Sequence, residues 1–288
     1  MKAPLGTPTE PSRQGSAATV TGKAIVGIGR VLLWSGGSLW IGRATGRAQA
    51  HEHHAIQISL ALSGRLRLRG EEDDDWTEYA AAVVWSHQRH QFDGAGEMVA
   101  QIFVEPETWQ GRALLRRRGD RPVEALPVDT TEALVQSLRA GFVAGSQDEV
   151  LVAASQRLVA SFCVPEPLPT SVDPRISRAI EFIRARLNKP VPLAEAAAAA
   201  HLSPSHFRHL FVAQTGMSFR AYLLWARVES AVGAAMGGLS WTVAAQNWGF
   251  ADSAHLSRTC RRMFGIAPTM LVRESSERTP ETALRQMP

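Results

Sequence analysis

The C-terminal part of the chain contains one pattern twice, and this duplication constrains the fold more than any other feature. The first copy occupies residues 193–219 and the second occupies residues 241–268. Ala197 corresponds to Ala245 at an offset of 48, whereas positions after the predicted turn correspond at an offset of 49. Each copy therefore predicts a helix-turn-helix unit with a turn of variable length. Two such units in one chain suggest contact with two successive major grooves of DNA.

Each copy has the residue types that begin a helix and allow a tight turn. Ser203 followed by Pro204 predicts an N-cap and a first helical position, and Asp252 is the expected cap in the second copy. Gly249 lies in the turn of the second copy, and His201 takes its place in the first. Glycine is the cheaper residue if that turn needs a positive φ angle.

The second helix of each copy leaves a polar face that can donate hydrogen bonds to bases and phosphates. The candidate DNA-binding residues are Ser205, Arg208, His209, Ser253, His255, Arg258, Arg261 and Arg262. Residues 173–273 hold 12 Lys and Arg against 5 Asp and Glu, although the whole chain has a net charge of only +4. Most of the positive charge therefore lies where DNA would bind, which predicts a salt-dependent affinity.

A continuous helix is predicted between the two copies, over about residues 218–236. Its length of roughly 28 Å approaches the ~34 Å between major grooves on one face of B-DNA. These features together resemble the DNA-binding domain of the AraC/XylS family of bacterial transcription regulators, over residues 173–272. The matching segments are L-S-P-S-H-F-R-H-L-F, T-G-M-S-F-R-A-Y-L, W-A-R-V-E-S-A, W-G-F-A-D-S-A-H-L-S-R and F-G-I-A-P. Ala254 and Cys260 depart from the family pattern, and because Ala254 weakens one candidate base contact, the second unit is expected to read fewer bases or to read DNA shape instead.

The first half of the chain is predicted to form short antiparallel strands. Runs rich in Val, Ile, Leu and Trp alternate with Gly or charged turns at 24–26, 30–34, 38–41, 55–62, 65–69, 81–85 and 98–104. Their close spacing predicts a small β-barrel. This part resembles the cupin-like sensor domain that is attached to many AraC/XylS regulators.

One set of residues in the predicted barrel could bind a metal ion. His51, His53 and Gln57, followed by Gly64, reproduce the spacing of the first cupin motif with Gln for the usual Glu, and His90 lies where the second motif places its histidine. On a strand, His51 and His53 would share one face, and three imidazoles with an amide oxygen suit Fe, Mn, Ni or Zn. The same side chains could instead contact an effector directly, or be satisfied locally in a structural role.

The expected fold class is α+β with two domains: a cupin-like barrel with two following helices, and an all-α domain of two helix-turn-helix units joined by a long helix. The expected segments are a disordered N-terminus (1–22), the barrel (23–105), a helical segment (106–162), a linker (163–172), the DNA-binding domain (173–272) and a flexible tail (273–288). Residues 146–149, Ser-Gln-Asp-Glu, have the spacing of a capping box. The apolar stripes of helices 106–162 serve either dimerisation, as the resemblance implies, or packing against the barrel.

The cysteines and the length of the apolar stretches bear on the location of the protein. Neither cysteine is placed to form a disulfide bond, and no apolar stretch is long enough to span a membrane, so a cytoplasmic location is expected. The predicted function is a transcription regulator that is not an enzyme, with double-stranded DNA and a small-molecule or metal effector as partners. A homodimer and contact with RNA polymerase are also expected. The alternative is a metal-dependent cupin enzyme acting on a small molecule, in which His51, His53 and His90 would hold the metal.

Overall fold

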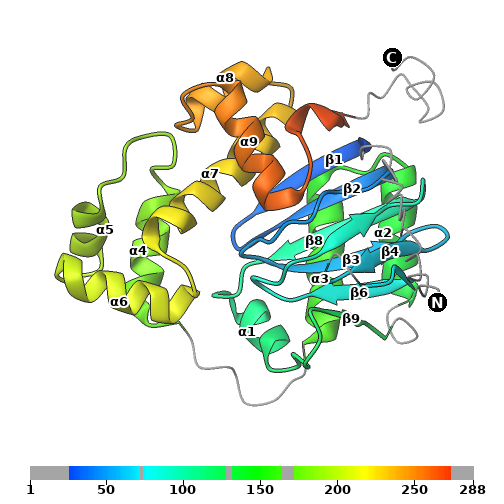
Figure 1. The fold of residues 1–288 in the computed structure, drawn as a ribbon, viewed down its shortest axis with the longest axis horizontal. Helices are drawn as coiled ribbons and strands as arrows, with labels where there is room; N and C mark the ends of the chain where they lie inside the picture. Colours follow the sequence, from blue (N-terminus) through cyan, green and yellow to red (C-terminus); the bar gives the residue numbers. More distant parts are fainter. Residues whose placement is uncertain (1–25, 72–73, 128–131, 164–171, 274–288) are drawn as a thin grey trace, which may run out of the picture.

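A computed structural model describes residues 26–71, 74–127, 132–163 and 172–273. The chain has a β-rich N-terminal part and a helical C-terminal part, which confirms the expected α+β class (Figure 1). The N-terminal strands are β1 (Val26–Trp34), β2 (Gly37–Thr45), β3 (Ile56–Ala61), β4 (Leu66–Arg69), β5 (Thr77–Tyr79), β6 (Ala81–Val84), β7 (Gln91–Asp93), β8 (Met98–Val104) and β9 (Val123–Ala125). Most of the expected tail and linker, and all of the expected disordered N-terminus, lie outside the described residues.

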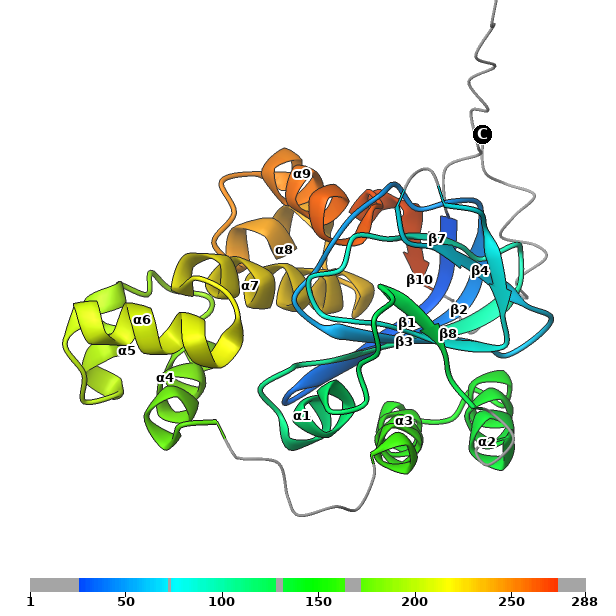
Figure 2. The same ribbon diagram turned by 60° about the horizontal axis from the view of Figure 1, so that its bottom comes forward.

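The strands form two sheets that face each other. The larger sheet has seven strands in the order β10-β1-β2-β8-β3-β6-β9, and the smaller has the order β5-β4-β7. The helices of the C-terminal part lie beside one end of the two sheets (Figure 2). All neighbouring strands pair antiparallel except β1 and β10, which are parallel.

The larger sheet is buried on both faces because alternate side chains enter different layers. Ile56, Ile58 and Leu60 of β3 point to the outer face and pack with the helices there. Between them, Gln57 and Ser59 point into the barrel interior and are nevertheless buried. The period-2 alternation of β3 thus places polar side chains inside the barrel.

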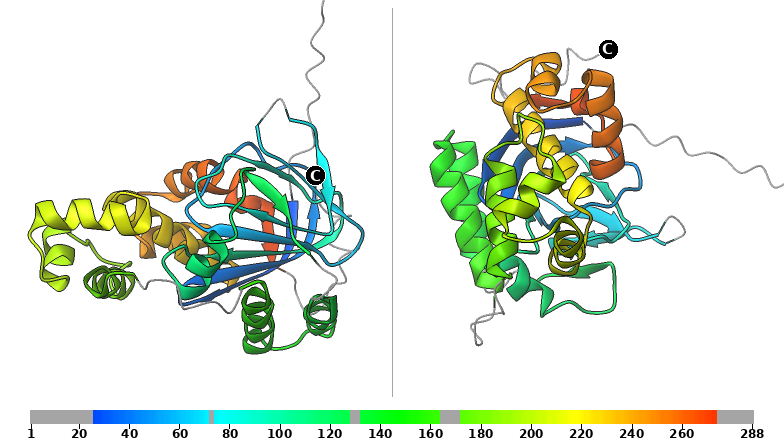
Figure 3. Two further views of the ribbon diagram at one scale, coloured as in Figure 1. Left: turned by 90° about the horizontal axis from the view of Figure 1, so that it is seen from below. Right: turned by 90° about the vertical axis from the view of Figure 1, so that its left-hand side faces the viewer.

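The outer face of the larger sheet is covered by α2 (Glu132–Val143) and α3 (Asp148–Phe162), as Figure 3 shows. The apolar stripes of the two helices, which include Leu138 and Leu158, pack in one cluster with the strands. The stripes were expected to serve either dimerisation or packing against the barrel, and in the structure they pack against the barrel. The expected capping box is wrong: the N-cap of α3 is Gln147, without a side-chain cap hydrogen bond.

The C-terminal part consists of two similar helix pairs joined by a longer helix. Its helices are α4 (Pro174–Arg184), α5 (Leu193–Ala199), α6 (Pro204–Thr215), α7 (Phe219–Met236), α8 (Trp241–Asn247) and α9 (Ser253–Phe264). Helix α7 crosses between the α4–α6 group and the α8–α9 pair (Figure 1). Its 18 residues span about 27 Å.

Several short elements lie outside the expected pattern, among them β5 and β7 of the smaller sheet. Helix α1 (Trp109–Leu115) and strand β9 precede the two expected helices, so the segment expected to be helical also adds a strand to the sheet. After α9, a 3-10 turn (Pro268–Met270) leads to β10 (Leu271–Arg273), which pairs with β1 of the barrel. The C-terminal part is therefore not purely helical, because the chain returns to the barrel after the second helix-turn-helix unit. No helix among the described residues is long and apolar enough to cross a membrane.

The buried side chains form three clusters that do not follow the expected domain boundary. The first helix-turn-helix unit has its own cluster, which includes Phe207, Phe211 and Tyr222. The second unit shares a cluster with the barrel interior, where Leu256 and Phe264 join barrel residues. The second helix-turn-helix unit is thus packed as part of the barrel.

Candidate functional site

The two helix-turn-helix units have matching dimensions and matching helix caps. Helices α5 and α8 have 7 residues each, and α6 and α9 have 12 each. Ser203 and Asp252 accept hydrogen bonds from the backbone N–H of His206 and His255, as expected for N-caps. The sequence duplication therefore corresponds to a structural duplication.

The turn inside each unit uses a left-handed residue, and so does the end of each second helix. His201 has a φ of 54° and Gly249 a φ of 77°, so both copies require the positive φ expected there. Gly216 ends α6 with a φ of 75°, and Gly265 ends α9 with a φ of 68°. His201 has a Cβ atom, so this conformation is sterically unfavourable for it, whereas Gly249 adopts the same conformation without that cost.

Seven of the eight candidate DNA-binding residues are exposed on α6 and α9, and the eighth, His255, is half-buried against Phe250 at a ring-centroid distance of 5.2 Å. The exposed residues are Ser205, Arg208, His209, Ser253, Arg258, Arg261 and Arg262. Both second helices therefore offer cationic and polar groups to a partner. The buried Cys260 lies inward and takes no part in this surface.

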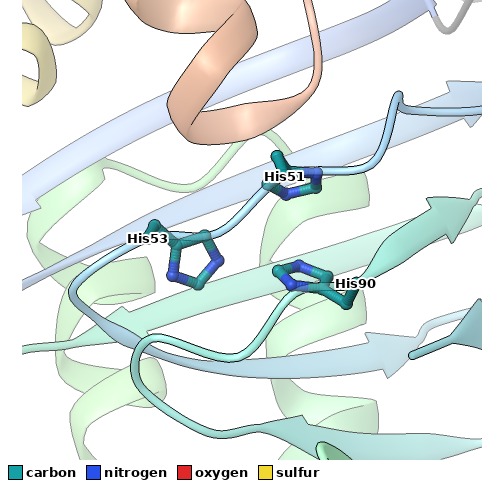
Figure 4. Close-up of side chains that lie close together, drawn as sticks. All are labelled: His51, His53 and His90. Carbon is teal, nitrogen blue, oxygen red and sulfur yellow. The ribbon is translucent and has the colours of Figure 1, made fainter. Parts of the chain in front are cut away.

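A second candidate site lies inside the barrel, where three buried histidines meet. One ring nitrogen of each of His51, His53 and His90 lies within 4.8 Å of the others, and the rings face one another (Figure 4). His51 and His53 lie on the loop between β2 and β3, and His90 lies just before β7. The two loops are joined by reciprocal backbone hydrogen bonds between His51 and His90, with N–O distances of 3.0 and 2.9 Å.

Each of the three imidazoles donates one N–H to a backbone carbonyl. Nδ1 of His51 lies 2.8 Å from the carbonyl oxygen of Gln49, and Nδ1 of His53 lies 2.9 Å from that of Ala55. Nδ1 of His90 similarly lies 3.0 Å from the Gln88 carbonyl oxygen. Because a carbonyl only accepts, these contacts favour the tautomer with the proton on Nδ1, which leaves Nε2 bare in a neutral ring.

Gln57 completes this cluster with its amide oxygen. Oε1 of Gln57 lies 2.9 Å from Nε2 of His53 and 3.3 Å from Nε2 of His90. The other end of the Gln57 amide is held by hydrogen bonds: its Nε2 donates to Ser59 Oγ at 2.9 Å, and Ser59 Oγ donates to Gln101 Oε1 at 2.7 Å. These contacts orient the amide oxygen toward the histidines. Gln101 is a member of this polar row that sequence reasoning missed, although its place in the inward-facing alternation of β8 is the signal that would have found it.

Burial keeps the three rings neutral. It lowers the pKa of His51 to about 3 and that of His53 to about 4, and the neighbouring histidine ring lowers that of His51 further. Burial also lowers the pKa of His90 well below its usual value, and both neighbouring rings act in the same direction. The imidazoles are therefore in the protonation state that binds metal ions at neutral pH.

The geometry that brings the histidines together differs from the expected one. His51 and His53 were expected on one face of a strand, but they lie in the loop before β3, with only an isolated bridge at His51. His54, which follows His53 in the chain, does not join the cluster. Its Nε2 lies 2.8 Å from Glu107 Oε2, in a buried pair outside the cluster.

A cavity of about 100 Å³ borders the histidine cluster, several times the roughly 10–15 Å³ that one water needs. Its walls are mainly apolar, and His51 and Gln57 line it as polar residues. Met236 of α7, Phe264 of α9 and Leu271 of β10 also line it. The cavity thus has walls from both parts of the chain. Sequence reasoning missed the C-terminal wall residues, since only tertiary packing brings them to the barrel.

Buried polar contacts also join the two parts. Ser38 Oγ donates to Glu229 Oε1 at 3.2 Å, and Arg184 of α4 forms an ion pair with the buried Glu105. Burial raises the pKa of Glu229 to about 7. The C-terminal helices are therefore held on the barrel by polar as well as apolar contacts.

Comparison with known proteins accounts for the duplicated helices. Residues 196–274 match a family model described as a helix-turn-helix domain. Over these residues the C-terminal part of this chain is similar to a helix-turn-helix domain. The match covers both helix-turn-helix units and ends just after β10.

Two relatives extend this comparison. The regulatory protein PocR of Salmonella typhimurium is 26% identical over 118 residues, which cover 40% of this chain and 39% of PocR, less than half of either protein. The crystal structure of ToxT from Vibrio cholerae aligns over 86% of this chain and 95% of its own, with 11% identity and a TM-score of 0.51. At this identity, ToxT shows that the arrangement of a β-rich part followed by the helical part is shared.

Proposed function

We propose that the protein is a sequence-specific DNA-binding transcription regulator whose barrel senses a small molecule or a metal ion. The C-terminal helix-turn-helix domain would place α6 and α9 in two successive major grooves. The match of residues 196–274 to a helix-turn-helix family and the exposed arginines of both helices support the DNA-binding role.

One observation supports the sensing role above the others. The cavity beside the three histidines is walled by the barrel on one side and by Phe264, Ile266 and Leu271 of the C-terminal part on the other. An occupant would therefore contact the sensing part and the DNA-reading part at once. A ligand shifts the equilibrium between two conformations only if it contacts them differently. An occupant of this cavity would do so if the two conformations differ in how the C-terminal helices sit on the barrel.

A selection experiment tests DNA recognition directly. The full chain is used to enrich duplexes from a random pool, and the enriched sequence is footprinted. We expect protection of two segments about 34 Å apart on one face of the duplex, and an affinity that falls steeply with salt. A pool that shows no enrichment over several rounds would contradict the proposed function.

A homodimer and contact with RNA polymerase remain proposed partners. Because the apolar stripes of α2 and α3 pack on the sheet, a dimer formed through these helices would use their outer faces, where Val143 and Val150 are exposed. Light scattering of the purified chain at several concentrations measures this directly. A constant mass of one chain, 31.3 kDa, would contradict the dimer.

A further inference from the structure

The histidine cluster brings together four atoms that can only accept. The three Nε2 atoms are bare because each ring proton lies on Nδ1, and the amide oxygen of Gln57 is turned toward them by the bond from its own nitrogen to Ser59. In this tautomer the Nε2 atoms of His53 and His90 and the Gln57 oxygen face one another as acceptors. Buried lone pairs that face one another are unfavourable without a partner, and a cation is the partner that satisfies all four.

We propose that this centre binds a divalent first-row transition metal ion and that its presence is transmitted to recognition helix α9. Three imidazole nitrogens and one neutral oxygen are a donor set for such ions, whereas Mg²⁺ and Ca²⁺ prefer oxygen ligands throughout. The Nδ1–carbonyl hydrogen bonds are the outer contacts that orient metal-binding histidines. The transmission rests on the proposed function, since it matters only if α9 reads DNA.

The loop that carries His51 is attached to the last turn of α9. The backbone N–H of Gln49 donates to the carbonyl oxygen of Gly265 at 2.9 Å. A Cβ atom on Gly265 would overlap the Gln49 carbonyl oxygen and would lie 2.6 Å from Nδ1 of His51. The Gln49 carbonyl oxygen is also the acceptor that orients the His51 ring. No space separates the metal ligand from the helix cap.

An ion would fix the spacing of the two loops. A tetrahedral ion with metal–nitrogen bonds of about 2.1 Å holds its ligand nitrogens about 3.4 Å apart. The histidine nitrogens are set only within 4.8 Å of one another. Any adjustment of the His51 loop to the ion's geometry would be passed to Gln49, and through its hydrogen bond with Gly265 to the end of α9. The position of the second DNA reader thus depends on whether the ion is present.

Metal binding is tested with Co²⁺ alone, added to the full chain after chelator treatment. We expect one ion per chain by equilibrium dialysis and visible absorption bands typical of a low-symmetry site with nitrogen ligands. His90→Ala should abolish both signals, whereas His206→Ala, which removes an exposed histidine on α6, should leave them unchanged. A second variant guards against misfolding: Gln57→Glu supplies a charged oxygen and should bind Co²⁺ more tightly, a gain that an unfolded chain cannot give.

Transmission is tested by measuring the affinity for the selected DNA duplex with and without Co²⁺. We expect the ion to change the dissociation constant for DNA by about 5–150-fold, and DNA to change the dissociation constant for the ion by the same factor. Gly265→Ala should reduce this factor toward one, because its Cβ displaces the His51 loop. Gly216→Ala is the matched control: it has the same left-handed strain, but its Cβ would meet only His87 at an ordinary 3.5 Å.

The outcomes separate the two proposals. Absence of bound Co²⁺ in the wild-type chain, or equal binding by His90→Ala, overturns the metal site. Bound Co²⁺ with an unchanged affinity for DNA overturns the transmission. In both cases duplex enrichment by the metal-free chain still supports the proposed function. Enrichment by neither form of the chain would contradict that function, while the dialysis result would continue to decide the metal site.

Discussion

Single exposed arginines on the second helices are expected to carry measurable binding energy. Arg208 on α6 and Arg258 on α9 are exposed on the surface that we propose contacts DNA. We expect Arg208→Ala and Arg258→Ala each to weaken binding of the selected duplex by about 1–3 kcal/mol, measured by fluorescence anisotropy at fixed salt. Arg139→Ala, on the exposed face of α2, is the control and should have little effect. Unchanged affinity in both variants would remove the assignment of these helices as DNA readers.

The buried Glu229 should make stability depend on pH. Burial raises its pKa to about 7, while Arg184 and the hydrogen bond from Ser38 oppose this shift. Because its pKa in the folded state is above the unfolded value, the folded chain binds the proton more tightly. The stabilisation is therefore complete below about pH 4.5 and is lost as the pH rises through about 7.

The variant Glu229→Gln isolates this contribution. Glutamine keeps a hydrogen-bonding partner for Ser38 but does not titrate. The histidines of the barrel titrate as well, so the informative quantity is the difference in free energy of unfolding between the two proteins. Urea unfolding at pH 5 to 8 should show wild type losing stability relative to the variant as the pH rises. A difference that does not vary with pH would refute the raised pKa.

At the scale of residues, the histidine set could be predicted from spacing, but its geometry could not. The positions of His51, His53, Gln57 and His90 indicated a shared site, and the structure brings these four side chains together. A strand was the expected reason, whereas two hydrogen-bonded loops are the observed one. Loop conformations depend on long-range backbone pairing that no local pattern encodes. Whether the set binds a metal stays a prediction.

At the scale of elements, the caps of the second helices should contribute separately to stability. Asp252 accepts a hydrogen bond from the N–H of His255 at 2.6 Å. Asp252→Ala should lower the free energy of unfolding by about 0.5–2 kcal/mol, measured by urea denaturation. Asp252→Asn retains a capping oxygen and should restore most of the loss. If both variants lose equally, the effect comes from charge near the helix end rather than from the cap.

The helices were more predictable than the short strands for a physical reason. Ser203 and Asp252 mark helix starts through local hydrogen bonds, so neighbouring sequence contains the signal. Strands β9 and β10 have three residues each, too few for an alternating pattern. They form by backbone pairing with β6 and β1, which lie far from them in the sequence. The apparent capping box before α3 shows the opposite error, since the spacing was present but Gln147 became the cap.

At the scale of the whole molecule, the three buried clusters predict how the chain opens. Helix α9 shares its cluster with the barrel interior, whereas α6 belongs to a separate cluster of the first unit. We therefore expect amide hydrogens of α9 to exchange with the same opening free energy as those of barrel strands, and those of α6 to exchange in a different step. Native-state hydrogen exchange with increasing denaturant measures this. A common step for α6 and α9, distinct from the barrel strands, would contradict it.

The pairing of β10 with β1 has a consequence for the order of events during synthesis. Gly27 and Ile28 lie beside Leu271 and Val272, so one edge of the barrel is completed only after both helix-turn-helix units have left the ribosome. Until then the edge of β1 is open and able to pair with other chains. A nascent chain interrupted before Leu271 would therefore carry both helix-turn-helix units on an unfinished barrel, exposed to aggregation and proteolysis.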